Sequence, residues 1–303
     1  MGMQSMQEHY PVMAGEVIEY LAVRPEGTYA DCSTGLGGHA RRIAGLLTTG
    51  RLICLDRDAE SLEKARLQLA EFGDRIAFRQ SLFSQLRQTL ASLGVEKVDG
   101  MVADLGVSRY QLTDPDRGFS LMVDGPLDMR MGRGEGPTAA DIVNFSSENQ
   151  IADIIYTYGE ERRARKLARA IVRTRPHRTT LALARVIEEA APRTGKLHPA
   201  TRTFMALRMA VNRELEELEA LLDQASEALA TGGRIVMLTF HSLEARIVKT
   251  RFQQWARDGR ASLLTKHVVR PQQEEVRRNP ASRSAMLRAA QIEEPQSTRD
   301  GEK

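Results

Sequence analysis

Asp31, Asp56 and Asp104 each stand at the end of a short apolar segment, and a glycine-rich loop follows the first of them. The loop reads DCSTGLGGHA from Asp31 to Ala40. Glycines allow a backbone to approach a ligand closely and leave its N–H groups free to donate. The Asp56 carboxylate has two acceptor oxygens, which match the two neighbouring hydroxyls of a ribose. This spacing predicts a binding site for an adenosine-containing cofactor.

The loop also satisfies the pattern of nicotinamide dinucleotide sites, because Gly35, Gly37 and Ala40 are followed by an acid about 20 residues later. A dehydrogenase therefore stays open on this evidence, as does a tight turn that binds nothing. Acids at three segment ends suit a cationic sulfonium with an amino-acid tail better than a pyrophosphate, which negative groups would repel. Phe83, after the third apolar segment, is placed to cover an adenine face.

The elements that must position these residues alternate between strand and helix in the first third of the chain. Strands are expected at 28–32, 51–56, 75–80 and 98–105, and helices at 35–47, 59–72 and 84–93. Strands separated by helices of this length imply a parallel sheet with its ligand crevice at the carboxyl ends of the strands.

From about 109 to 212 the periodicity is almost only helical, with helices expected at 151–158, 160–174, 180–191 and 200–209. The first pattern then resumes with a helix at 214–230, a strand at 234–240, a helix at 243–255 and strands at 263–269 and 284–292. The predicted fold is a doubly wound, Rossmann-like α/β sheet with an inserted all-helical subdomain. Its sheet domain comprises 1–108 and 212–292, its substrate-recognition insert 109–211, and its polar tail 293–303.

Composition excludes several other classes. Hydrophobic residues make up 42% of the chain and charged residues 27%, as in ordinary globular proteins. No apolar run approaches the roughly 18 residues of a membrane span, and the polar start lacks a signal peptide's apolar stretch. We therefore expect a cytoplasmic protein with no membrane partner. Cys32 and Cys54 lie in apolar segments without metal-ligand spacing, so buried thiols and no metal site are expected.

Basic residues concentrate in the segment RRARKLARAIVRTRPHR, from Arg162 to Arg178, which contains no acid. Five of its cations recur three or four residues apart and would share one broad face of a helix. They are Arg162, Arg165, Lys166, Arg169 and Arg173. Because the net charge is only +3, this uneven distribution, rather than the total, indicates a nucleic-acid surface. A solvated helix face with partners such as Glu160 and Glu161 is the alternative.

Stretches spread over nearly the whole chain match one known family. They are His9–Val12, Asp31–His39, Asp56–Asp58, Val98–Gly100, Asp104–Ser108, Gln111–Leu112, Arg117–Ser120, Asp124–Met131, Tyr158–Arg162, His198–Arg202, Phe240–Glu244 and Asn279–Ser284. Through them the chain resembles the small-subunit ribosomal RNA cytidine N4-methyltransferases, the MraW or RsmH family. The departures are Ser33 where threonine is usual, Arg109 where a serine is common, and Ala245 where an acid is usual.

The resemblance implies an S-adenosylmethionine-dependent methyltransferase that modifies the N4 amino group of a cytidine in the decoding region of 16S ribosomal RNA. Its partner would be that RNA within the small ribosomal subunit, and a homodimer stays open. The sheet domain would be the methyltransferase domain. The cofactor-binding residues that the resemblance implies are Gly37, Gly38, His39, Asp56, Phe83, Asp104 and Gln111.

This reaction needs an amine lone pair aligned with the methyl–sulfur bond, and the lone pair of a cytosine amino group is delocalised into the ring. Positioning must therefore supply much of the rate, and a base must take a proton from the cationic product. Asp104 is the leading candidate for a catalytic contact, with the Leu105 carbonyl as a second acceptor. His241, past the fifth strand, is either a second catalytic candidate or a structural hydrogen-bonder. The segment Asp124–Arg130 is expected to be an ion-paired loop that shapes the pocket.

Overall fold

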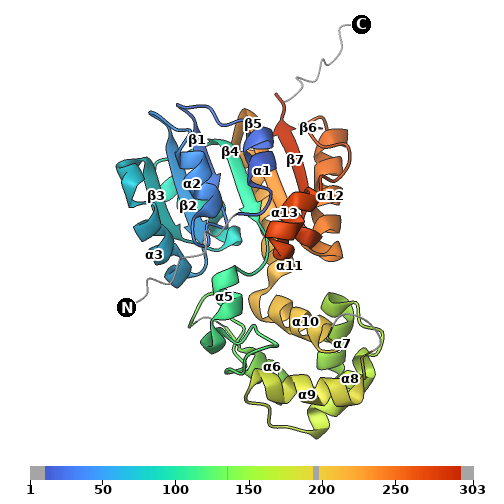
Figure 1. Cartoon of the computed structure of the whole chain (residues 1–303). Helices are drawn as coiled ribbons and strands as arrows, with labels where there is room; N and C mark the ends of the chain where they lie inside the picture. Colours follow the sequence, from blue (N-terminus) through green and yellow to red (C-terminus); the bar gives the residue numbers. More distant parts are fainter. Residues whose placement is uncertain (1–10, 135, 194–197, 295–303) are drawn as a thin grey trace, which may run out of the picture. The chain divides into compact units, whose positions relative to one another are not determined.

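The structure is a computed structural model that describes residues 11–134, 136–193 and 198–294 (Figure 1). It divides into two compact units. The first holds the described residues up to Gly106 and from Glu217 onward, and the second runs from Val107 to Glu216. The second unit thus begins two residues before the insert expected at 109–211 and ends five residues after it. His9, Tyr10 and positions 295–303 of the expected polar tail lie outside the described residues.

A seven-stranded sheet organises the first unit, in the order β3-β2-β1-β4-β5-β7-β6. The strands are β1 Thr28–Asp31, β2 Arg51–Asp56, β3 Ile76–Gln80, β4 Val98–Asp104, β5 Leu229–Thr239, β6 Ala261–Leu263 and β7 Met286–Ile292. The first five are mutually parallel, whereas β7 runs antiparallel to both of its neighbours. The inserted β7 departs from the 3-2-1-4-5-6 order of dinucleotide-binding sheets.

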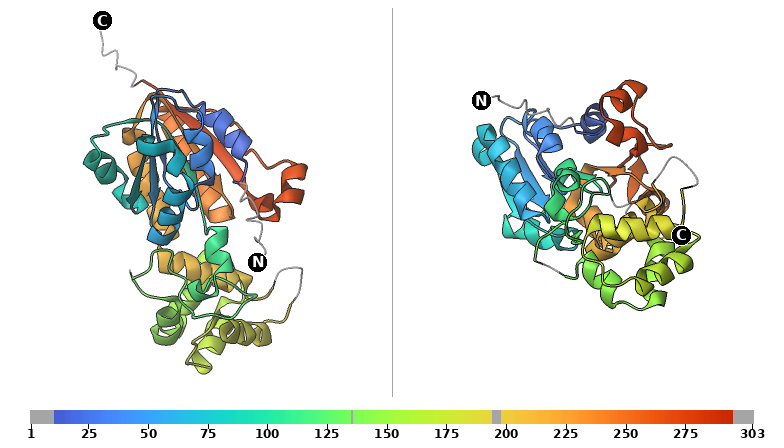
Figure 2. Two further views of the ribbon diagram at one scale, coloured as in Figure 1. Left: turned by 60° about the vertical axis from the view of Figure 1, so that its left-hand side comes forward. Right: turned by 60° about the horizontal axis from the view of Figure 1, so that its bottom comes forward.

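Helices cover both faces of this sheet, as the further views of Figure 2 show. One face packs against α4 Leu86–Ser92, α11 Glu214–Ala228 and α12 Ser242–Arg257, and the other against α1 Ala14–Leu21, α2 Gly38–Ala44 and α3 Ala59–Gln68. The strands alternate accordingly: Leu52 and Cys54 face one layer, and Ile53 and Leu55 face the other. A sheet buried on both faces explains why RLICLD is a nearly continuous apolar run. The doubly wound fold is confirmed.

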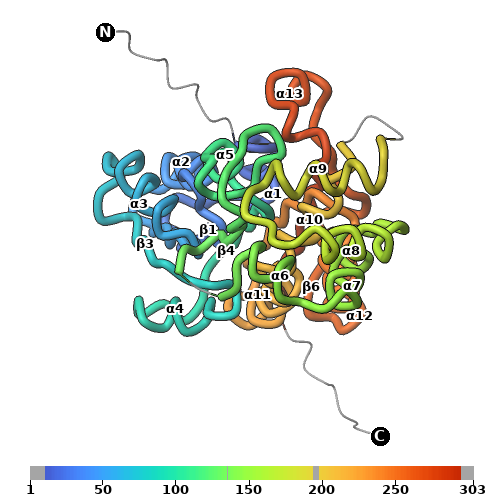
Figure 3. Tube along the Cα trace, turned by 90° about the horizontal axis from the view of Figure 1, so that it is seen from below, coloured from blue at the N-terminus to red at the C-terminus, as the bar shows by residue number. Residues whose placement is uncertain are grey.

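The second unit is helical and has a hydrophobic core of its own. Its helices are α5 Arg109–Thr113, α6 Ala139–Phe145, α7 Glu148–Gly159, α8 Ala164–Arg173, α9 Thr180–Ala190 and α10 Thr201–Asn212. Figure 3 shows α6, α7 and α8 side by side, and α7 also packs against α10. The helix expected at 160–174 begins only at Ala164, because Glu160 takes a left-handed conformation (φ 47°) that ends α7.

The two strands expected at the end of the chain are only partly correct. The first, expected at 263–269, is in fact β6 at Ala261–Leu263, and the chain meets β7 again only in an isolated bridge between Val269 and Leu287. The second begins at Met286 rather than at 284, because the residues before it form the short helix η4, Pro280–Ser284. Outside the segment 109–212, which was expected to be helical throughout, the α-helices of the described chain that no expectation covered are α1 and α13, Gln273–Arg278.

Candidate functional site at the carboxyl ends of the strands

The three aspartates singled out in the sequence lie at one edge of the sheet. Asp31, Asp56 and Asp104 are the last residues of β1, β2 and β4. Parallel pairing aligns these strand ends, because Asp31 lies opposite both Cys54 of β2 and Val102 of β4. The strand order reverses between β1 and β4, and such a switch point is where open α/β sheets bind ligands.

Asp56 holds the glycine loop in place. Its Oδ2 accepts a hydrogen bond from the Gly35 N–H at 2.7 Å, and its Oδ1 accepts one from the Asp58 N–H at 2.8 Å. Burial raises the pKa of this carboxyl to about 6, against the lowering effect of the two N–H donors. Each oxygen retains a second lone pair. The carboxylate can therefore still accept hydrogen bonds from the two ribose hydroxyls that its sequence position predicts as partners.

The glycines of the loop are required by the protein's own packing. Gly37 has φ +88° and is the N-cap of α2. A Cβ at this position would lie 2.9 Å from Leu69 Cδ1. A Cβ on Gly38 would lie 3.0 Å from Pro11 Cβ. Position 37 therefore favours glycine before any ligand is considered, because of its φ and the close contact, whereas a side chain on Gly38 would require Pro11 to shift.

His39, in the first turn of α2, lies between two of the acids. Its Nε2 is 3.5 Å from Asp104 Oδ2, and the backbone N–H of Asp104 donates to Ser33 Oγ at 2.6 Å. Ser33, which stands where the family usually has threonine, thus holds the backbone of Asp104 through its hydroxyl. Buried polar atoms without a hydrogen-bond partner among the described residues gather here: Asp31 Oδ2, Asp104 Oδ1 and both ring nitrogens of His39. Unpartnered buried acceptors fit a ligand that brings hydrogen-bond donors and positive charge.

The electrostatics of these groups agree with that fit. Burial raises the pKa of Asp31 to about 7, a rise that the charge of His39 opposes and the charges of Asp56 and Asp104 increase. Burial lowers the pKa of His39, but the neighbouring acids, Asp104 first and then Asp31 and Glu275, outweigh it and leave the pKa raised. The crevice therefore gathers three carboxyl groups around one imidazole, which favours a cationic ligand such as a sulfonium with an ammonium tail.

One acid near this crevice was missed by sequence reasoning. Glu275 of α13 accepts a hydrogen bond from the Met13 N–H at 2.7 Å, and its charge raises the pKa of His39. Met13 is in the left-handed region (φ 51°) and precedes α1. No local signal could have found this pair, because its members lie 262 residues apart in the sequence.

Two further cofactor candidates lie in different surroundings. Phe83 follows β3 in the short helix η2, Phe83–Gln85, and is partly buried against the sheet's core. Gln111 lies in α5 of the helical unit and is buried; its side chain accepts from the Ser108 N–H while Ser108 Oγ accepts from the Gln111 N–H. This reciprocal capping box gives Gln111 a structural role. Cofactor contacts for both residues stay predictions.

His241 caps α12. Its Nδ1 accepts from the Glu244 N–H at 3.4 Å, and its Nε2 lies 2.9 Å from Glu244 Oε1. Glu244 is itself buried and accepts from the Phe240 N–H through Oε2. Of the two interpretations of His241, the geometry favours the structural hydrogen-bonder, and a catalytic role stays a prediction.

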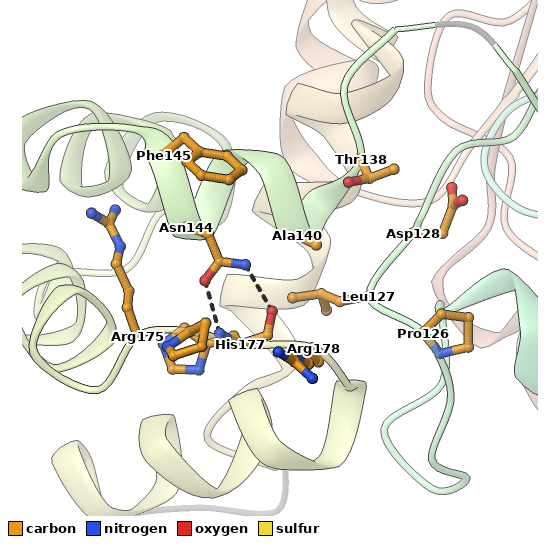
Figure 4. A pocket seen from close by; sticks show the side chains of 11 residues that line it. Pro126, Leu127, Asp128, Thr138, Ala140, Asn144, Phe145, Arg175, His177 and Arg178 are labelled. Carbon is orange, nitrogen blue, oxygen red and sulfur yellow. Dashed lines mark hydrogen bonds between the residues drawn. The ribbon is translucent and has the colours of Figure 1, made fainter.

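The helical unit contains a separate cavity of about 520 Å³ (Figure 4). Asn144 forms its back wall and bonds to both the N–H and the carbonyl oxygen of His177, each at 2.8 Å. Phe145, whose side chain is 83% exposed, stands at its rim. Asp128, also in the lining, makes the ion pair expected in this loop, with Arg130 at 2.7 Å. None of the expected site residues lines this cavity.

Comparison with known proteins decides between the cofactor classes that the loop left open. The chain is 57% identical over 284 residues to "Ribosomal RNA small subunit methyltransferase H" of Solibacter usitatus, covering 94% of this chain and 99% of that protein. It is 48% identical over 292 residues to the protein of the same name from Thermotoga neapolitana, covering 94% and 96%. Fold, crevice and relatives define a methyltransferase that takes its methyl group from S-adenosylmethionine. The chain belongs to the MraW methylase family, whose model matches residues 6–293. A dehydrogenase is thereby excluded.

The raised pKa of Asp31 predicts a cost to stability that cofactor binding relieves. A carboxyl whose pKa is about 7 when folded and 3.8 when unfolded stabilises the fold fully below about pH 4, and this contribution is lost as pH rises through 7. Asp31→Asn should therefore raise the free energy of unfolding without cofactor at pH 8 by about 1–3 kcal/mol. It should also weaken S-adenosylmethionine binding.

Chemical denaturation at pH 5 and pH 8 checks this prediction, with the exposed Asp74→Asn as the matched control. If Asp31→Asn keeps the same loss of stability between the two pH values as the unmodified protein, the carboxyl is not the source of that loss.

Proposed function

We propose that this protein methylates the N4 amino group of a cytidine in the decoding region of 16S ribosomal RNA, with S-adenosylmethionine as donor. The relatives' printed name, ribosomal RNA small subunit methyltransferase H, supports the RNA. The observation that carries the chemistry is the unpartnered, buried Oδ1 of Asp104 at the switch point of the sheet. We further propose the small ribosomal subunit as partner and the cytoplasm as location, and leave a homodimer open. No helix in the described part of the chain is long and apolar enough to cross a bilayer.

The test is transfer of a labelled methyl group to 16S RNA and to small ribosomal subunits, followed by mass mapping of the modified nucleotide. The proposal expects one N4-methylated cytidine. Cofactor binding without transfer to either substrate would instead indicate a nonenzymatic binding module, and a label on another atom would reject N4.

In this proposal each crevice residue does a distinct task. S-adenosylmethionine supplies an electrophilic methyl group on a sulfonium. The Asp104 carboxylate accepts a hydrogen bond from the target amine, which favours the pyramidal nitrogen, and takes its proton as the product becomes cationic. His39, 3.5 Å away, orients that carboxylate and balances its charge. The loop of Gly37 and Gly38, with Asp56, holds the nucleoside part.

Asp56→Asn should weaken binding of S-adenosylhomocysteine, the demethylated product, by about 1–3 kcal/mol, because the ribose loses a charged acceptor. Since Asp56 also holds the loop through Gly35, a simple loss of affinity has two explanations. Calorimetry with the 2′-deoxy form of the ligand separates them. Removing the hydroxyl should cost affinity in the unmodified protein and much less in the variant. Equal costs in both proteins would take Asp56 away from the ribose.

Asp104→Ala should lower methyl transfer by at least about 10²-fold, within the range that general acid–base groups contribute. The fold should survive, because the backbone N–H of Asp104 still donates to Ser33 and the lost Oδ1 had no partner. Asp104→Asn retains an acceptor oxygen and should keep part of the rate. Single-turnover rates under saturating cofactor check this, and near-normal turnover of Asp104→Ala would reject the assignment.

The helical unit is proposed to bind the RNA, through the basic face of α8. Four of the five predicted cations lie on α8, whereas Arg162 precedes the helix. All five are exposed, while Ala164, Leu167, Ala168 and Ile171 pack inward. Glu161 pairs with Arg163, which is outside the face. Arg169 is 3.4 Å from Glu148, the one acid for which an ion pair with this face is seen in the described chain. Such a face fits phosphate contacts, which add affinity without reading bases.

Arg165→Glu with Arg169→Glu should weaken RNA binding and reduce the slope of log affinity against log salt by about one unit per contact. S-adenosylmethionine affinity should not change. The control is Arg51→Glu with Arg185→Glu, which reverses the same charge at exposed positions of β2 and α9. If the α8 variant and the control have equal salt slopes, α8 is not the RNA surface.

A further inference from the structure

The sheet unit also contains a pocket, which lies beside β7 and α12, the elements at the right-hand edge of the sheet in Figure 1. Its volume is about 340 Å³. Four basic side chains line it, and no aspartate or glutamate does. They are Lys249, Lys266, His267 and Arg288. A pocket with lysine and arginine side chains in its lining and no carboxylate fits an anion.

The pocket exists because the chain bulges away from β7 after β6. Thr265 Oγ1 accepts a hydrogen bond from the Ala289 N–H at 3.1 Å, and Val269 and Leu287 exchange two bonds at 3.0 and 2.9 Å. Three residues, 266–268, therefore stand opposite the single Arg288. Bulges of this kind re-aim side chains and are frequent next to functional sites.

The bulge leaves donors available. Among the described residues, none accepts a hydrogen bond from the backbone N–H groups of Lys266, His267 or Val268. Lys249 and Gln253 are four residues apart on α12 and extend from the same helix face. Beneath them Phe252 is only 2% exposed and closes the floor. Side-chain and backbone donors thus surround a space with an apolar base.

Arg288 is the strongest sign that an anion belongs here. It lies partly buried in β7, and no ion pair or hydrogen bond joins its side chain to any other described residue. Burial lowers its pKa, with no carboxylate acting to raise it. A guanidinium that is partly withdrawn from water without a partner is less favourable than a paired one, and a phosphate matches its planar fork of donors.

We propose that this pocket binds a backbone phosphate of the substrate RNA, outside the reaction centre. The inference rests on the proposed RNA substrate. The register supports a separate site on the same sheet: Asp104 lies opposite Leu238 of β5, which lies opposite Leu287 of β7. Arg288 follows Leu287 and faces the α12 layer. The phosphate is therefore held two strands away from Asp104, on the face of the sheet opposite the Leu287 side chain.

The test compares Arg288→Gln, and separately Lys249→Gln with Lys266→Gln, against the matched control Arg51→Gln at the amino end of β2. RNA affinity is measured by fluorescence anisotropy over a salt series, and inorganic phosphate binding by calorimetry. Each pocket variant should weaken RNA binding about tenfold at low salt, as loss of a charge-assisted bond implies. Each should reduce the salt slope by about 0.7 per lost contact, the value for single strands. Cofactor affinity should stay unchanged.

Unaltered RNA affinity and salt slope in the two-lysine variant, whose exposed side chains are not needed for folding, would overturn the proposal. Loss of inorganic phosphate binding with RNA binding intact would also overturn it, by assigning the pocket to free phosphate. The proposed function is judged separately, by N4 methylation of 16S RNA with the unmodified protein. If that fails, the function falls; if it succeeds and the pocket variants bind RNA normally, only the pocket falls.

Discussion

The rest of the site depends on one constraint, the exclusion of water from carboxylates at a single sheet edge. Parallel register brings Asp31, Asp56 and Asp104 to the same edge of the sheet, with Asp56 and Asp104 two residues beyond the level of Asp31, and burial then raises the pKa of Asp31 to about 7 and that of Asp56 to about 6. His39 is the buried imidazole beside them, and the acids raise its pKa. Such an arrangement is unfavourable when empty and favourable around a cationic ligand rich in donors, so the same groups lower stability and give selectivity.

The glycine loop shows why a residue chosen for its ligand chemistry can also be structural. Asp56 accepts one backbone N–H from the glycine loop, at Gly35, and one from the turn that follows β2, at Asp58. Gly37 must be glycine because of its φ and because Leu69 occupies the space of a side chain. The ligand therefore meets a surface that the protein has already organised, which reduces the entropy lost on binding.

The hydrophobic pattern of the sequence predicted those elements whose bounds depend on local sequence. β2 was predicted to the residue, because a strand buried on both faces leaves a continuous apolar run. The end of β6 was misplaced, since the bulge opposite Arg288 is set by pairing with β7 rather than by its own sequence. The crevice acids were visible as strand-end aspartates. Glu275 was invisible, because only the packing of α13 against the chain at Met13 brings it near His39. The sequence left His241 open between a catalytic and a structural role, because its contact with Glu244 depends on the formation of α12.

The proposed function sets two electrostatic requirements. A crevice of carboxylates attracts a sulfonium but repels every phosphate of an RNA strand. In that proposal, affinity for the strand therefore comes from basic side chains that are not part of the crevice. The exposed face of α8 and the pocket around Arg288 have this character. A chain with 43 basic and 40 acidic residues can thus be nearly neutral overall and still present local groups of cations to a polyanion.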